Sequence, residues 1–259
     1  MTRTPLVALL WLATAGLAAA QPAPSRPDPA PAPAAAAQAF TPAQREEIVE
    51  VLRDALGRDP SILREAITAL RQADEADRAR GRRDAIANNA EALFRNAGDP
   101  SKGNPRGSLT IVEFFDARCT YCRALQPAMA ELLRRDRDLR VVLKDIPILG
   151  PNSVLASRAL FASQRQNKYE PFYDALLALR TDVTEATLQA EAQRVGLDWP
   201  RLRRDMDDPA IQTRINDNLR LAQSLGIEGT PALVIGTTLV PGAVDLDTLQ
   251  RLVAEARRG

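Results

Sequence analysis

The chain has 259 residues, of which 45% are hydrophobic and 26% are charged, and its formal net charge is +1. This composition is ordinary for a soluble globular protein, and it excludes collagen, a coiled-coil fibre and wholesale disorder. The near-zero charge implies no general attraction to nucleic acid or to an anionic lipid surface. The chain has no histidine and only two cysteines. Every mechanism that needs an imidazole is therefore excluded, including a Ser-His-Asp triad, a Cys-His pair and a His-ligated zinc site.

The first twenty residues have the pattern of a cleaved secretory signal. One basic residue, Arg3, precedes an apolar run over residues 6–17, and the small residues 18–20 stand before Gln21. The run is too short to span a bilayer comfortably, and no cysteine stands directly after the cleavage site to carry a lipid. We therefore expect residues 1–20 to be removed and a soluble protein to reach the oxidising periplasm. An uncleaved anchor is the alternative.

Two further segments precede the main domain. Residues 21–40 are nearly all alanine and proline, which predicts a disordered tether because such a sequence has little to bury. Residues 41–98 predict a helical arm whose apolar stripes hold too few large residues to fold alone. Those stripes must meet either the following domain or the arm of another copy. A homo-oligomer formed through residues 41–80 and an arm folded back on its own domain are both open.

The arm carries clear helix start signals. The sequence Thr-Pro-Ala-Gln at 41–44 combines an N-cap, a proline at the first helical position and a capping-box glutamine, and it predicts a helix over about 42–57. An Asp-Pro pair at 59–60 repeats the signal for a second helix. Glycine weakens a helix interior, so we expect a joint at Gly81.

The pattern changes after the arm, where a domain is predicted over residues 99–259. A β-rich run at 109–115 is typical of a central buried strand. A helix is predicted from Cys119 to about residue 135, and a second strand over 139–146. Strand, helix and strand in this order predict a βαβ unit with a parallel pair.

The rest of the domain is mostly helical. Residues 151–225 read as several consecutive helices, followed by short strands at 232–235 and 237–240 and by a closing helix over 245–257. The predicted fold is therefore α/β, with a helical block inserted between two halves of one sheet.

The two cysteines form the motif Cys119-Thr120-Tyr121-Cys122, placed where a strand gives way to a helix. A Cys-x-x-Cys in a βαβ context is typical of thioredoxin-like redox chemistry. Thiolate is favoured at the positive end of the helix, so Cys119 is the expected nucleophile and Cys122, one turn further in, is the expected resolving cysteine. A purely structural disulfide would close too small a loop to add much stability. A zinc site lacks further ligands, whereas copper(I) held by two thiolates remains chemically open.

Three segments resemble a known family: residues 114–122 around the motif, 144–151, and the Gly-Thr-Pro segment within 226–232. They are similar to the DsbA-family thiol:disulfide oxidoreductases, and most of all to the Com1/ScsC-type branch, which carries an N-terminal helical extension. The resemblance covers residues 82–257 well and 41–81 in general character. It implies a thioredoxin-like fold interrupted by a helical insertion, in agreement with the pattern of strands and helices.

The resemblance also implies a substrate-binding edge. In this family the residues that match Thr230 and Pro231 are joined by a cis peptide bond that faces the cysteines, and the exposed backbone there pairs with an extended client strand. Thr120 and Tyr121, between the cysteines, complete the expected substrate-binding set. An ordinary turn before a strand is the alternative for the Gly-Thr-Pro segment.

Charged residues near the motif have expected roles. Glu113 stands in the middle of an apolar strand, where a carboxylate is costly unless it is paired or functional. The resemblance implies that this acid takes the proton of the second cysteine and that Lys144, on the next strand, pairs with it. An outward-facing glutamate is the alternative. Asp116 and Arg118 flank the motif, and we expect them to be solvated, with Arg118 also favouring thiolate on Cys119.

Oxidases and isomerases of this kind share their cysteines and differ in redox poise, which the intervening dipeptide tunes. The strong oxidases of the family usually carry Pro-His between the cysteines, whereas this chain has Thr-Tyr, closer to DsbC- and ScsC-type isomerases and reductases. We therefore expect an exported disulfide isomerase or reductase, with a DsbA-like disulfide-donating oxidase as the alternative and a copper(I)-handling or holdase protein as a remote one. Expected partners are cysteine-containing exported proteins and a membrane redox partner that recycles the cysteines, with no cofactor.

Overall fold

The computed structural model describes residues 40–258, which form two units that divide between Ile67 and Thr68. The predicted signal segment and nearly all of the predicted tether, residues 1–39, lie outside the described residues. The arm expected over residues 41–98 is split by this division, because its later part belongs to the unit that holds the sheet. Within residues 40–258, no helix is both long enough and apolar enough to cross a membrane.

The arm helices begin as their caps predict. In α2 (Pro42–Arg58) the Thr41 hydroxyl accepts from the backbone N–H of Gln44 at 3.3 Å, and the Gln44 side chain accepts from the backbone N–H of Thr41 at 2.9 Å. The next helix, α3 (Ser61–Asn88), is continuous, so the predicted joint at Gly81 is wrong. One glycine costs only about 1 kcal/mol in a helix interior, too little to interrupt a long run of good helix formers.

A five-stranded sheet forms the centre of the second unit, in the order β1-β3-β2-β4-β5. Its strands are β1 (Ser101–Gly103), β2 (Leu109–Phe115), β3 (Leu139–Asp145), β4 (Ala232–Ile235) and β5 (Thr238–Pro241). The pair β2–β3 is parallel, as the βαβ prediction required, and the other three pairs are antiparallel. The short strand β1 was not predicted, because three residues that end in a glycine carry no alternating pattern.

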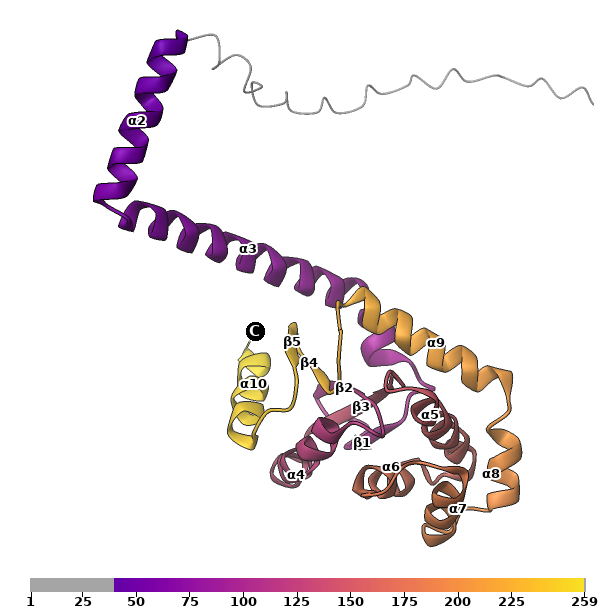
Figure 1. Ribbon diagram of the computed structural model, residues 1–259. Helices are drawn as coiled ribbons and strands as arrows, with labels where there is room; N and C mark the ends of the chain where they lie inside the picture. The colour runs from indigo at the N-terminus through magenta and orange to yellow at the C-terminus, as the bar shows by residue number, and fades with distance from the viewer. Residues whose placement is uncertain (1–39, 259) are drawn as a thin grey trace, which may run out of the picture. The chain divides into compact units, whose positions relative to one another are not determined.

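Seven helices of the second unit follow the first strands in the chain (Figure 1). They are α4 (Thr120–Arg135), α5 (Pro151–Ser163), α6 (Tyr169–Ala178), α7 (Glu185–Arg194), α8 (Trp199–Asp205), α9 (Pro209–Ser224) and α10 (Leu246–Arg258). A short π-helical segment, η1 (Glu91–Arg95), precedes β1, and a 3₁₀ turn, η2 (Gln164–Gln166), follows α5. Helices α5 to α9 stand between β3 and β4 in the chain, which confirms the predicted insertion. The chain is therefore a thioredoxin-like α/β fold with a helical insertion.

The two faces of the sheet bury different side chains, because successive residues of a strand point to opposite faces. One face packs Ile111, Phe115 and Leu143 against α4, α10 and the insertion. The other packs Val112 and Phe114 against the end of α3, η1 and α9. Both cysteines belong to the core on the first of these faces, so the register of β2 and β3 decides which charged side chains lie on their side of the sheet.

Candidate active site

Cys119 is the N-cap residue of α4, and its sulfur takes the place of a capping side chain. The Cys119 Sγ accepts a hydrogen bond from the backbone N–H of Cys122 at 3.4 Å, and the Cys119 thiol donates to the carbonyl oxygen of Thr230 at 3.2 Å. Both cysteines are free and buried, with Cys122 fully enclosed. The nucleophile expected from the sequence therefore lies at the positive end of the helix, where a negative charge on sulfur is stabilised.

The two thiols differ sharply in acidity. A hydrogen bond from the Cys122 side chain lowers the pKa of Cys119 to about 5, with help from the Thr230 side chain and from the backbone N–H groups of Cys122 and Tyr121. The same hydrogen bond to Cys119, together with burial, raises the pKa of Cys122 well above its ordinary value. At neutral pH the first sulfur is a thiolate and the second keeps its proton, an arrangement suited to attack by Cys119 followed by resolution through Cys122.

The predicted substrate-binding residues lie around Cys119. The Thr230–Pro231 peptide bond is cis, and the Thr230 carbonyl contacts the Cys119 sulfur. Tyr121 is 69% exposed and Thr120 is also exposed. Thr230 is half-buried and Pro231 is buried. The structure thus brings all four predicted positions to the same end of α4.

Glu113 is a buried acid, not an outward-facing one. Its Oε1 accepts from the Tyr173 hydroxyl at 3.1 Å and from the Gln126 side chain at 3.3 Å. Burial raises the pKa of Glu113 to about 7, against the lowering effect of these hydrogen bonds. Gln126 also approaches the backbone carbonyl of Cys122 at 3.5 Å, so the acid is one side chain away from the resolving cysteine.

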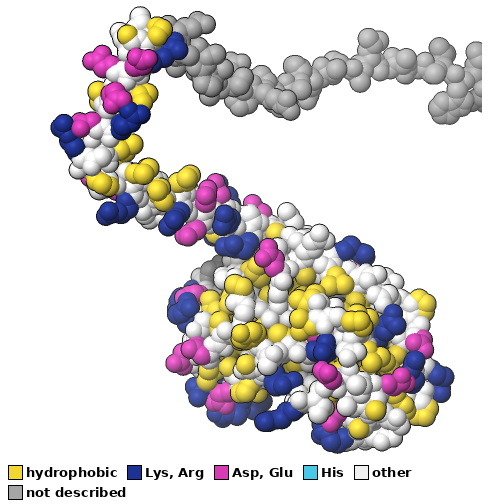
Figure 2. Space-filling model, viewed as in Figure 1, with side chains coloured by type: hydrophobic (Ala, Val, Ile, Leu, Met, Phe, Trp, Pro, Cys, Tyr) yellow, Lys and Arg dark blue, Asp and Glu magenta, His cyan; other side chains and the backbone are white. Residues whose placement is uncertain are grey.

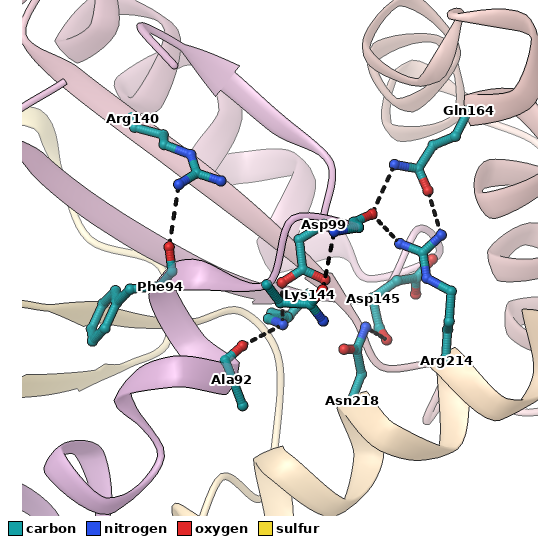
Figure 3. Close-up of polar contacts among 11 residues, drawn as sticks. Ala92, Phe94, Asp99, Arg140, Lys144, Asp145, Gln164, Arg214 and Asn218 are labelled. Atoms are coloured by element: carbon teal, nitrogen blue, oxygen red, sulfur yellow. Dashed lines mark hydrogen bonds and ion pairs between the residues drawn. The ribbon is translucent and has the colours of Figure 1, made fainter. Parts of the chain in front are cut away.

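The expected pairing of Glu113 with Lys144 is wrong. Glu113 is in register with Leu143, whereas Lys144 is in register with Phe114, so the two charged side chains lie on opposite faces of the sheet. Figure 3 shows the Lys144 ammonium group between the Asp99 carboxylate, with which it forms an ion pair, and the carbonyl oxygen of Ala92, 2.8 Å away. Lys144 therefore anchors the segment between η1 and β1 and does not touch the acid.

A different lysine approaches Glu113. Lys102 on β1 is in register with Val141 of β3, and Glu113 is in register with Leu143, two residues further along the same strand. Lys102 and Glu113 therefore lie on the same face of the sheet. Its Nζ lies 5.1 Å from the centroid of the Tyr173 ring and 2.6 Å from Oδ1 of Asp174. The positive charge of Lys102 lowers the pKa of Glu113, and the negative charge of Asp174 raises it.

Asp116 is a structural anchor, and the expectation that it is solvated is wrong. This fully buried carboxylate accepts hydrogen bonds from the backbone N–H groups of Arg118, Ile148 and Leu149 and from the Ser153 hydroxyl, at 2.8–3.0 Å. These bonds tie the turn before Cys119 to the loop after β3 and to the first turn of α5. Backbone N–H groups compensate a buried carboxylate well, which explains why it is tolerated there.

Sequence reasoning missed three residues around the acid: Gln126, Tyr173 and Lys102. Gln126 had a usable signal, since it lies four residues after Cys122 on the same face of α4 and is polar among apolar neighbours. Tyr173 and Lys102 had none, because they reach the site from α6 and from a strand that the pattern did not reveal.

Comparisons with known proteins agree with this geometry. A model of the DSBA-like thioredoxin domain matches residues 110–254. A thioredoxin-like oxidoreductase from Silicibacter pomeroyi superposes with a TM-score of 0.64 and 40% identity, covering 65% of this chain and 98% of that one. ScsC from Proteus mirabilis superposes with a TM-score of 0.63 and 32% identity, covering 84% of this chain and 98% of that one.

Curated relatives match between about half and two thirds of the chain. The thiol:disulfide interchange protein DsbA of Bordetella pertussis is 26% identical over 148 residues, 55% of this chain and 70% of that protein. A Na(+)/H(+) antiporter NhaA of Salinispora arenicola is 29% identical over 167 residues, 62% of this chain and only 26% of the antiporter. The chain thus spans about a quarter of the antiporters that it matches. Because the family model covers more than half of its residues, the chain belongs to the DsbA-like thioredoxin-domain family.

Proposed function

We propose that the protein rearranges or reduces disulfides of exported, cysteine-containing proteins, with Cys119 as nucleophile and Cys122 as resolving thiol. The observation that carries this proposal is the opposite displacement of the two thiol pKa values within one helical turn. The Cys119 thiolate attacks one sulfur of a client disulfide, whose S–S bond breaks as the Cys119–client bond forms. The client sulfur that leaves takes up a proton.

Two outcomes follow from the mixed disulfide. In isomerisation, a client thiolate attacks the bond to Cys119, restores the Cys119 thiolate and leaves the client with a new pairing and no net change in oxidation. In reduction, Cys122 gives up its proton and attacks the Cys119 sulfur, which forms the Cys119–Cys122 disulfide and releases the client with two more electrons. Glu113, whose pKa is raised to about 7, is suited to receive that proton through a water.

The arm supports isomerisation over simple oxidation. Helix α2 has no buried residue, and large apolar side chains of the arm are exposed, including Val51 at 62% and Leu70 at 63%. Figure 2 shows hydrophobic side chains mixed with charged ones along these helices. A second copy is the occupant that we propose for this surface over residues 41–80. Two active sites held in one assembly would raise the effective concentration of the second site for a client already bound to the first.

One observation favours the oxidase alternative. A thiol whose pKa is as low as about 5 stabilises the reduced protein, which makes its disulfide a better oxidant. The same thiolate also speeds the attack that an isomerase needs, so acidity alone does not choose between the directions. We expect a membrane redox partner to reset the cysteines in either case, and we propose periplasmic export through the signal at residues 1–20.

Trapping experiments test the roles of the two cysteines. Cys122→Ala should accumulate mixed disulfides with clients on non-reducing gels, because Cys119 attacks but nothing resolves the adduct. Cys119→Ser should form none and should lose dithiol reductase activity. Adducts with Cys119→Ser and not with Cys122→Ala would reverse the assignment. Recovery of a scrambled multi-disulfide protein by the full-length chain would support the isomerase, and net thiol oxidation without recovery would support the oxidase.

A further inference from the structure

A polar pocket lies at the first turn of α4, and its lining includes Arg118 and Thr120, the two neighbours of Cys119 in the chain. Thr120 and Arg123 are three residues apart on the helix and therefore share a face, while Cys122 between them is buried in the core. The polar residues that line the pocket are Arg118, Thr120, Arg123, Arg180, Thr181 and Asp182. The lining residues thus carry three guanidinium groups and one carboxylate, which gives the pocket an excess of positive charge near the nucleophile.

Two of these arginines are held in place by backbone carbonyl groups. Arg118 Nη1 donates to the carbonyl oxygen of Leu149 at 2.7 Å, and its Nη2 lies 3.3 Å from Oδ1 of Asp182. Arg123 donates through Nε to the carbonyl oxygen of Leu177 at 2.7 Å. Within residues 40–258, the two Nη groups of Arg123 have no hydrogen-bond partner or ion pair. An anchored guanidinium with free N–H groups loses little freedom when it binds an anion.

We propose that this pocket binds a carboxylate carried close to the reacting sulfur of the thiol partner, and that it thereby favours clients with an acidic residue beside the cysteine. The proposal rests on the proposed function, since Thr120 at the edge of the pocket directly follows Cys119. Carboxylates match the planar fork of arginine, which donates two parallel N–H groups. Asp182 already occupies one side of Arg118, so Arg123 and Arg180 carry the selectivity.

Matched peptides test this selectivity with the reduced full-length chain. Each peptide carries one cysteine activated by 2-thiopyridine, an uncharged leaving group, and either Asp or Asn beside that cysteine. At low salt the Asp peptide should release thiopyridine roughly fivefold faster, the size expected for one modest ion pair, and this ratio should fall as salt screens the charges. Oxidised glutathione and its ester form a second pair of disulfide probes, which differ only in whether their carboxylates are free. Comparing the two pairs distinguishes a small glutathione-like compound from a peptide as the source of the carboxylate.

Variants separate the pocket from net charge. Arg123→Gln and Arg180→Gln should each lower the Asp/Asn ratio, and Arg123→Lys should keep part of it. Arg251→Gln, which removes an exposed arginine of α10 with the same change in net charge, should leave the ratio unchanged. The proposal would be overturned if, at low salt, the Asp and Asn peptides reacted at equal rates and so did oxidised glutathione and its ester. It would also be overturned if Arg251→Gln lowered the Asp/Asn ratio as much as Arg123→Gln does.

The proposed function fails in a different way. In that case neither peptide would release thiopyridine, or the release would persist in Cys119→Ser. Exchange that depends on Cys119 but ignores the carboxylate would refute the pocket alone, and a ratio above one only for glutathione would identify the small thiol as its occupant.

Discussion

At the scale of single residues, the candidate site depends on which face of the sheet each charged side chain occupies. Glu113 on β2 and Lys144 on β3 are one position apart in the parallel register, so their side chains lie on opposite faces of the sheet. Lys102, from the antiparallel edge strand β1, faces the acid instead. The buried acid is thus kept beside a positive charge, while Lys144 neutralises Asp99 elsewhere.

Replacing Glu113 by glutamine should change stability in a pH-dependent way. The folded-state pKa of about 7 lies above the ordinary value of 4.5, so the stability linked to this proton is present below 4.5 and is lost as pH rises to 7, by up to roughly 3 kcal/mol. Glu113→Gln does not titrate and so avoids that loss. The free energy of unfolding of the variant minus that of wild type should therefore be larger at pH 8 than at pH 5. Denaturant titrations at both pH values measure it.

The same variant should be slower in the second step of exchange, since an amide cannot take the proton of Cys122. The check is the rate at which Cys122 resolves a preformed mixed disulfide. A stability difference that does not vary with pH, combined with an unchanged rate profile, would mean that Glu113 titrates as an ordinary exposed glutamate.

Lys102→Met should move the pH profile of the resolving step to higher pH, because loss of the positive charge raises the pKa of Glu113 further. Asp174→Asn should move it to lower pH, because the negative charge that raises this pKa is removed. Lys144→Met, which leaves Asp99 buried without its partner, should lower stability by about 3 kcal/mol or more without moving the profile. Single-turnover rates across the pH range give the pH profile of each variant, and denaturant titration gives the stability of Lys144→Met. Equal shifts of the profile for Lys102→Met and Lys144→Met would contradict the assignment.

At the scale of elements, local signals predicted most boundaries and long-range contacts produced the surprises. The N-cap at Thr41, the βαβ unit and the helical insertion could all be predicted from short segments, because caps and periodicity are local. The cis bond before Pro231 and the position of Cys119 on α4 followed from the family resemblance and the motif. Lys102 and Tyr173 could not be predicted, because the strand β1 and the packing of α6 depend on the assembled sheet.

Gly81 gives an element-scale prediction, since it lies inside the continuous helix α3 and a Cβ added there would meet open space, with nothing beyond the local helix within 4 Å. Gly81→Ala should raise stability by about 0.5–1 kcal/mol through the lower entropy of the unfolded chain. Gly236→Ala is the matched contrast: φ is +59° there and a Cβ would stand 3.0 Å from the Cβ of Ala256, so this variant should lose stability. Thermal unfolding of both proteins measures the difference. A loss of stability in Gly81→Ala would indicate that α3 bends in solution.

At the scale of the whole molecule, the proposed division of labour is between a redox domain and an arm that gathers copies. Each large apolar side chain that a second copy covers contributes roughly 1.5–3 kcal/mol, against an association cost that is itself large. Several such side chains per copy are therefore needed, and the arm exposes them on both of its helices.

Deleting residues 41–80 should therefore give a monomer that still reduces a simple disulfide but no longer recovers a scrambled protein. The double variant Leu52→Lys and Leu70→Lys should do the same with the chain length kept, and Glu50→Lys, at an exposed polar position of α2, should stay assembled. Light scattering gives the mass of each protein, and a scrambled-substrate assay gives its isomerase activity. A full-length chain that is monomeric at micromolar concentration and lacks isomerase activity would favour the oxidase.

The four hydrogen bonds of Asp116 have a consequence for how this domain can be recombined. Because one carboxylate fastens the turn before Cys119, the loop at Ile148 and Leu149, and Ser153 of α5, the start of the insertion is inherited together with the nucleophile. A graft of the insertion from a relative would keep the sulfur in position only if its junction lay beyond Ser153. Such a graft would also have to keep Tyr173 of α6, because its hydroxyl donates to Glu113. The redox centre and the first turn of α5 therefore form one structural unit.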